Sequence, residues 1–124
     1  MRKIRFRGVS KLENNWVFGD CMHLSANGKE LAISKDNSEL HPIYSASIGQ
    51  ITDFVDVNGE EIYEGDYVKI NSEDFPDPLL VTFENGAFKI GDNAVDWFCN
   101  APNTVNGEIT GTAYFFGSKT AAGD

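Results

Sequence analysis

Four carboxylates lie close together at the centre of the chain, at Glu60, Glu61, Glu64 and Asp66. Two carboxylates at short range can act as a general acid and a general base. No Lys, Arg or His lies within this segment to tune or complement them. We therefore expect solvated acids in a turn rather than catalytic residues, and we expect that the protein is not an enzyme.

Two cysteines and two histidines are the other side chains with obvious chemistry. Cys21 and His23 are two residues apart, so on a strand they share one face. A zinc site needs one close pair of ligands at each end, and Cys99 and His41 do not form a second pair. A Cys–His pair can also be a nucleophile, but no oxyanion motif accompanies this one. We expect two free thiols and no metal or cofactor.

The N-terminus is basic although the chain as a whole is acidic. Residues 1–11 carry five of the ten basic side chains and no acid. Lys3, Arg5 and Arg7 alternate with apolar residues, so a strand would turn the three cations to solvent on one face. This interaction face can bind phosphate groups or dock on an acidic protein surface.

Beyond this start the charge balance reverses. The net charge is -9, and residues 53–77 carry nine acids against Lys69 alone. Such a surface repels nucleic acid and anionic membranes. We therefore expect a protein partner and no membrane. The edge strands of a small, partly open barrel would be covered by symmetric assembly, so we also expect a homo-oligomer. Nucleic acid bound by the basic strand is the alternative, and an acidic mimic that occupies a DNA-binding protein is a third reading.

Turn signals recur along the chain. Asn-Gly occurs four times, at residues 27–28, 58–59, 85–86 and 106–107. A two-residue Asn-Gly loop is a strong hairpin signal because both positions favour positive φ. The alternating segments between turns predict strands at residues 4–7, 16–25, 29–34, 47–54, 67–71, 79–84, 87–90 and 109–116. Residues 35–42 and 72–78 are expected to be loops, and AVDWFC at 94–99 fits one helical turn or a strand.

The central acids are expected to serve this architecture. Asn58 and Gly59 would make a turn, and Gly65 would take a backbone conformation that other residues avoid. Asp66 can accept backbone N–H groups in the turn that opens the next strand. Together with Glu64, these residues predict a structural corner of a small barrel.

Length and composition fit one domain, or one domain with a small subdomain. The chain has 124 residues, of which 41% are hydrophobic. No apolar run approaches the ~20 residues of a membrane span. The start, MRKIRFRG, lacks the apolar core of a secretion signal, and the cysteines do not indicate an oxidising compartment. A cytoplasmic location is expected.

The segment GQITDFVDVNGEEIYEGDYVKI, residues 49–70, resembles the signature of the YopX family of phage and prophage proteins. The matching residues are Gly49, Gln50, Thr52, Asp56, Asn58, Gly59, Glu61, Ile62, Tyr63, Glu64, Gly65, Asp66, Val68, Lys69 and Ile70. MRKIRFRG, WVFG at 16–19 and VTFENGAFKI at 81–90 are also similar. Asp53-Phe54 and the last strand, ITGTAYFFG, depart from the family pattern.

The resemblance implies a mainly β fold with an SH3-like β-barrel at residues 47–118. A small β-rich part at residues 1–46 would precede it, and residues 119–124 would form a flexible tail. The resemblance also implies a phage or prophage origin, hence a bacterial host cell and a partner that is a phage or host protein. It supplies no catalytic residues, because the family has no established activity. The expected protein is thus a non-enzymatic accessory protein that binds protein or assembles with itself.

Overall fold

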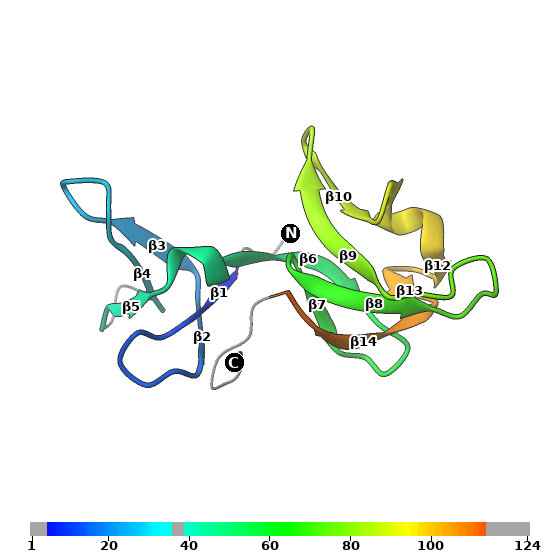
Figure 1. The fold of residues 1–124 in the computed structure, drawn as a ribbon, viewed down its shortest axis with the longest axis horizontal. Coiled ribbons are helices and arrows are strands. Elements are labelled where there is room, and N and C mark those ends of the chain that lie inside the picture. The colour runs from blue at the N-terminus through cyan, green and yellow to red at the C-terminus, as the bar shows by residue number, and fades with distance from the viewer. Residues whose placement is uncertain (1–4, 36–38, 114–124) are drawn as a thin grey trace. The chain divides into compact units, whose positions relative to one another are not determined.

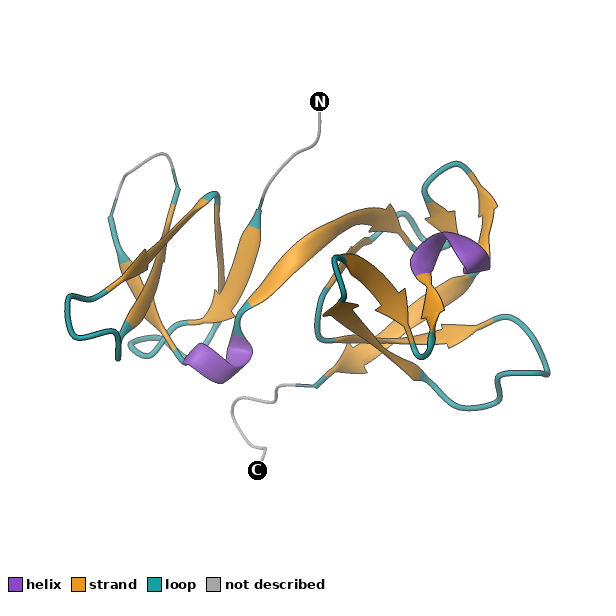
Figure 2. Ribbon diagram, turned by 90° about the horizontal axis from the view of Figure 1, so that it is seen from above, coloured by secondary structure: helices purple, strands orange, loops and turns teal. Residues whose placement is uncertain are grey.

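The fold described here is a computed structural model, which describes residues 5–35 and 39–113. Strands dominate this part of the chain, as expected, and its two helices are short 3-10 segments (Figure 2). Lys3 and residues 119–124, for which predictions were made, lie outside the described residues. No helix in the described ranges is both long enough and apolar enough to cross a membrane.

The chain divides into two compact units. Among the described residues, the N-terminal unit ends at Gln50, and the C-terminal unit is Ile51–Ala113. Strand β6 (Gly49–Val55) begins in the first unit and continues in the second. Each unit is therefore described by itself.

The N-terminal unit contains five short strands and one 3-10 helix. They are β1 (Phe6–Val9), β2 (Trp16–Gly19), β3 (Cys21–Leu24), β4 (Leu31–Ser34), β5 (His41–Ile43) and η1 (Ser45–Ser47). β1 pairs antiparallel with β2 on one side and with the start of β6 on the other, and β4 lies between β3 and β5. The prediction of a single strand at residues 16–25 is thus wrong. The segment forms two strands that are separated at Asp20, of which β2 pairs with β1 and β3 pairs with β4.

The core of the N-terminal unit is small and aliphatic. Val9, Ile33 and Ile43 are fully or almost fully buried. The backbone N–H of Tyr44 donates to the carbonyl of Val9 at 3.0 Å, so the end of β1 also meets the end of β5. Glycine at position 8 leaves room for the Ile43 side chain, whose Cδ1 atom would lie 2.6 Å from an added Cβ. Branched aliphatic side chains therefore fill this core, and Gly8 provides the space that the Ile43 side chain occupies.

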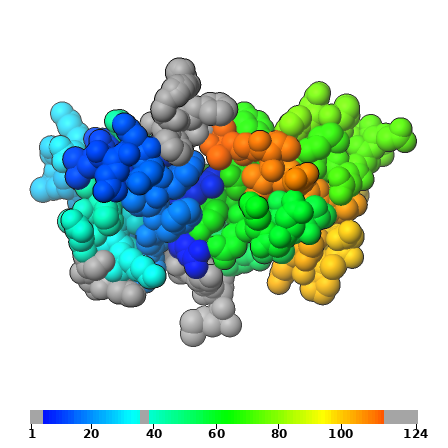
Figure 3. All heavy atoms as spheres, turned by 90° about the horizontal axis from the view of Figure 1, so that it is seen from below, coloured from blue at the N-terminus to red at the C-terminus, as the bar shows by residue number. Residues whose placement is uncertain are grey.

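The C-terminal unit is built on an antiparallel sheet. After β6 come β7 (Glu61–Tyr63), β8 (Asp66–Ile70), β9 (Leu79–Glu84), β10 (Ala87–Ile90), β11 (Asn93–Ala94), η2 (Val95–Phe98), β12 (Cys99–Ala101), β13 (Thr104–Val105) and β14 (Gly107–Thr112). The order of the main sheet is β11-β10-β9-β8-β14 (Figure 1). Figure 3 shows β14, in orange, beside the green atoms of β8. The ambiguous segment 94–99 is thus one turn of 3-10 helix that leads into β12.

The C-terminal unit has its own apolar core. Its buried members are Ile62, Val68, Ile70, Val81, Ile90, Val95, Phe98 and Val105. Strand β8 shows the period of two that a half-buried strand requires, because Asp66, Val68 and Ile70 are buried and Tyr67 and Lys69 are not. The ring of Phe75 packs edge-on against Phe98 at 5.2 Å between centroids, so the loop at 72–78 is fastened to this core.

The four Asn-Gly pairs do not all make the expected two-residue loop. Only Asn85 and Gly86 both have positive φ, at 53° and 82°, and this pair joins β9 and β10 within the bounds predicted from the sequence. At 27–28 and 58–59 the glycine alone has positive φ, and at 106–107 neither residue does. The other loops differ because hydrogen bonds to Ser25 and Asp56 shape the first two, while Gly107 already belongs to β14.

Candidate functional site: a cationic hollow along β2

The N-terminal unit has a hollow of about 580 Å³ beside β2. All four residues of β2 line it, together with Asp20, Arg5, Lys35 and His41. We call this site the β2 hollow. Its volume lies within the range of small-molecule pockets.

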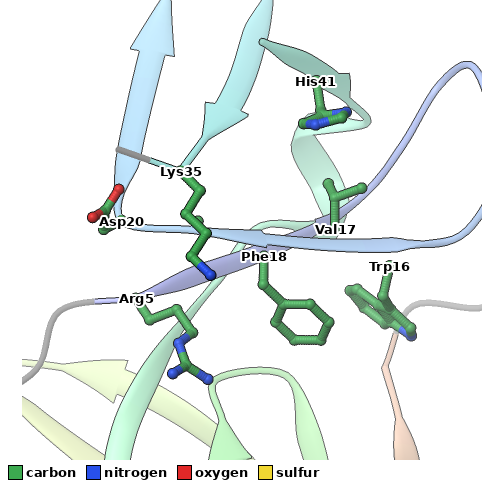
Figure 4. A pocket seen from close by; sticks show the side chains of 8 residues that line it. Arg5, Trp16, Val17, Phe18, Asp20, Lys35 and His41 are labelled. Carbon is green, nitrogen blue, oxygen red and sulfur yellow. The ribbon is translucent and has the colours of Figure 1, made fainter. Parts of the chain in front are cut away.

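Side chains of different character line the two sides of β2. Figure 4 shows Arg5, Phe18 and Trp16 on one side of the strand, with the Lys35 ammonium group reaching the same side. Val17 and His41 lie on the other side (Figure 4). One side therefore combines cations with aromatic rings, and the other carries Val17 and His41.

The chain pairing explains how these residues meet. β1 and β2 pair with Phe6 opposite Gly19, which places Arg5 beside the end of β2 at Asp20. Lys35 directly follows β4, and His41 begins β5. Arg5 and Lys35 are thirty residues apart in sequence, so their proximity to one strand depends on the fold and not on a local motif.

Arg7 does not belong to an exposed cationic face, so that part of the sequence prediction is wrong. The residue is buried, with 9% of its surface exposed. Its guanidinium carbon lies 4.4 Å from the centroid of the Trp16 ring, which is a cation–π contact. Trp16 thus shields Arg7, and alternation along β1 misjudged it because the aromatic ring comes from the neighbouring strand. Arg5 is half-buried and lines the β2 hollow.

The residues of the central acidic segment form a corner between strands. Gly59 donates its N–H to the Asp56 carbonyl at 3.0 Å, and the backbone N–H of Asn58 donates to Oδ1 of Asp56 at 2.9 Å. Gly65 follows Glu64 in the next turn and has a φ of 96°, a conformation that favours glycine. Asp66 is buried, and its Oδ2 accepts the N–H of Tyr63 at 2.8 Å.

The residue that organises this corner is Asp56, to which sequence analysis assigned no role. It is 1% exposed. Oδ1 accepts the N–H groups of Asn58 and Glu60 at 2.9 and 3.0 Å, while Oδ2 accepts the N–H of Ile109 in β14 at 3.0 Å. An aspartate two residues before Asn-Gly is a sequence signal for such a turn. One carboxylate therefore ties a local turn to a strand fifty residues away.

The cysteines and histidines are dispersed among structural contacts. Nε2 of His23 lies 2.9 Å from the hydroxyl oxygen of the buried Ser34, which gives this histidine a polar partner in the neighbouring strand. Within residues 5–35 and 39–113, no three His, Cys, Asp or Glu side chains are grouped as metal ligands. Cys21 and Cys99 are free thiols.

Cys99 has a perturbed thiol. Burial raises its pKa above the ordinary value, and the nearby negative charge of Asp96 adds to the effect. A raised pKa leaves less thiolate at a given pH, and the thiolate is the nucleophile that reacts with alkylating reagents. In a Cys21→Ser background, iodoacetamide should therefore modify Cys99 more slowly in the folded protein than in urea. Asp96→Asn should speed the folded-state reaction, which mass spectrometry can follow. An unchanged rate would show that Asp96 does not contribute to the raised pKa of Cys99.

The fold and the β2 hollow define a mainly β protein of two units with a cationic, aromatic groove on the first. The family model for the YopX protein matches residues 5–114, which is most of the chain. The chain belongs to the YopX family. Comparison with curated proteins and with solved structures found no match.

Proposed function

We propose that this YopX-family chain is a non-enzymatic phage or prophage accessory protein that acts by binding protein, copies of itself included. The observation that carries the proposal is the β2 hollow, where Arg5 and Lys35 lie beside aromatic rings in a chain of net charge -9. Arginine and aromatic side chains are enriched at protein interfaces and among their energetic hot spots.

The remainder of the proposal concerns architecture and location. We propose that the C-terminal unit belongs to an SH3-like barrel, as expected for residues 47–118, supported by the β8–β9–β10 meander and by a 3-10 helix placed before a last set of strands. We further propose that the protein acts in the cytoplasm of a bacterial host cell. Neither a metal nor another cofactor is required for binding of this kind.

A nucleic-acid role is the second candidate. The Trp16 and Phe18 rings beside Arg5 are of the kind that stack on bases while a cation binds phosphate. The burial of Arg7 weakens this candidate because it removes one of the three cations expected to follow a phosphate backbone. The net charge also opposes a long polyanion.

Affinity capture from host lysate distinguishes the two. The tagged protein is incubated with lysate with and without nuclease, and bound proteins are identified by mass spectrometry. A stoichiometric protein that is retained after nuclease treatment is the expected result. Loss of every bound protein on nuclease treatment would replace the proposal with the nucleic-acid role.

Self-assembly is tested by the molar mass of the purified chain. Light scattering after size exclusion should show a mass above that of one 13.7 kDa chain, and the mass should fall when Arg5→Glu and Lys35→Glu are combined. Lys29 is an exposed cation outside the β2 hollow, so Lys29→Glu is the matched control. A mass of one chain at every concentration would limit the proposal to other protein partners.

A further inference from the structure

We propose that the outer edge of β3 pairs antiparallel with β3 of a second copy, so that the sheet β3-β4-β5 continues across a two-fold axis. This inference rests on the self-binding part of the proposed function, and it names the surface and the register. The contact is separate from the β2 hollow. Three features carry it: the open edge of β3, the two apolar side chains that β3 exposes, and the distribution of charge along the chain.

The outer edge of β3 is the open edge of a three-stranded sheet. The order of this sheet is β3-β4-β5, and within the described part of the chain no strand pairs with the outer side of β3 (Figure 1). The outer edge of β5 is covered, because the N–H of Lys11 donates to the carbonyl of Pro42 at 2.9 Å. Pro42 itself has no N–H to donate. β3 contains neither a proline nor a charged side chain, which are residues that usually protect such an edge.

The pairing of β3 with β4 determines which backbone groups lie on this edge. The N–H of Ser25 donates to the carbonyl of Glu30 at 2.9 Å, so these residues form a hydrogen-bonded pair. Such pairs alternate along an antiparallel ladder, and His23 therefore directs its N–H and C=O at β4. Met22 and Leu24 direct theirs away from β4. Among the described residues, the structure gives these outward groups no hydrogen-bond partner.

One register of two antiparallel copies satisfies all of these outward groups. It places Met22 of each copy opposite Leu24 of the other, so that both residues exchange N–H and C=O bonds with the second strand. His23 then lies opposite the second copy's His23 on the two-fold axis. This central pair is not hydrogen-bonded, and its Cα atoms would be about 4.5 Å apart.

The side chains of Met22 and Leu24 favour the same register. They are 47% and 66% exposed, although they lie on the face of the sheet that carries the buried Ile33. In the proposed register each Met22 packs against Leu24 of the second copy, so the apolar face continues across the axis. Cross-strand apolar pairs of this kind stabilise a sheet, and their burial removes apolar surface from water.

Charge favours a second copy as the occupant of this edge. Residues 1–50 carry seven basic and five acidic side chains, whereas residues 51–113 carry two basic and thirteen acidic ones. Two copies that met through residues 51–113 would bring like charges together. A two-fold contact places a surface against itself, so an uncharged strand outside this acidic region is the suitable place for it. The same neutral strand offers no charge to a phosphate backbone or to a basic partner.

Molar mass from light scattering tests the contact. The contact is small, so the mass of wild type should rise with concentration from that of one 13.7 kDa chain. At high concentration, Leu24→Lys should lower the mass about twofold, because the lysine would have to bury its charge against the second copy. Leu12→Lys is the matched control, since Leu12 is 79% exposed and lies between β1 and β2. Equal masses for the two variants would overturn the inference.

A disulfide tests the register. In a Cys21→Ser, Cys99→Ser background, His23→Cys should oxidise to a covalent dimer, because a Cα separation of about 4.5 Å lies within the range that disulfides span. Leu12→Cys in the same background is the control and should remain a single chain on a non-reducing gel. Circular dichroism establishes that each variant is folded. Equal cross-linking at the two positions, or none at position 23, would overturn the proposed register.

The remaining outcomes separate this inference from the function on which it rests. An oligomer whose mass Leu24→Lys does not change would leave self-assembly standing and overturn the β3 contact. A wild-type mass of one chain at every concentration would overturn the β3 contact as well. A stoichiometric protein captured from nuclease-treated lysate would, in that case, leave the protein-binding function standing.

Discussion

Replacing Gly19 with alanine should destabilise the N-terminal unit by about 3 kcal/mol, the upper end of the range for overpacked positions. A Cβ at this position would lie 2.3 Å from the carbonyl oxygen of Ser34 and 2.5 Å from Cγ2 of Ile33. The oxygen belongs to the backbone of β4 and cannot rotate away as a side chain could. Because β2 and β4 must therefore separate, the substitution also disturbs the strand that lines the β2 hollow.

Tryptophan fluorescence can report this effect in one unit at a time. The chain has two tryptophans, Trp16 in the N-terminal unit and Trp97 in the C-terminal unit. Urea unfolding of Gly19→Ala in a Trp97→Phe background should show a lower midpoint through Trp16. The Trp97→Phe parent, which keeps Gly19, is the reference for this midpoint. A Gly19→Ala midpoint equal to that of the parent would contradict the close approach of β2 and β4.

Asp56→Asn should destabilise the C-terminal unit by about 3 kcal/mol. Hydrogen bonds to charged groups contribute about 1.5–3 kcal/mol each, and a buried donor without an acceptor costs about 1–3 kcal/mol. The amide retains one oxygen for the turn at Asn58 and Glu60, but its NH₂ group would face the N–H of Ile109. Two donors would then oppose each other in a site that is 1% exposed.

The corresponding measurement uses Trp97. In a Trp16→Phe background, the urea midpoint of Asp56→Asn should fall well below that of the parent. Asp92→Asn removes the same charge at an exposed position of the same unit and should shift the midpoint by only a few tenths of a kcal/mol. If both variants unfolded at the parent's midpoint, the carboxylate would not hold the turn and β14 together.

The sequence predicts elements best where the determinant is local. The β9–β10 hairpin was predicted with its observed bounds because Asn85-Gly86 supplies both positive φ angles in two adjacent residues. The strands that were missed are β5, β7, β11, β12 and β13, and the loop predicted at residues 35–42 is wrong at its end, where β5 begins at His41. Each has two or three residues, and distant partners specify some of them, as in the parallel pairing of Thr104 with Val55. A strand of two or three residues is too short to show an alternation of apolar and polar residues in the sequence.

The candidate site was predicted in part. Arg5 was singled out from the alternation at the N-terminus, and it lines the β2 hollow. Lys35 and His41 carry no local signal, because only the pairing of β3, β4 and β5 brings them to β2. Arg7 was misplaced for the same kind of reason, since the ring that covers it belongs to Trp16 on the neighbouring strand. Asp56, by contrast, had a readable signal in its position before Asn58-Gly59.

The most direct test of the account is a quantitative capture experiment with three forms of the protein. Wild type, the Arg5→Glu, Lys35→Glu variant and the Lys29→Glu control are used at equal concentration in nuclease-treated host lysate. The expected result is one protein partner that wild type and Lys29→Glu retain equally and that the double variant loses. Equal retention by all three forms would contradict the claim that the β2 hollow is the binding site of this YopX-family protein.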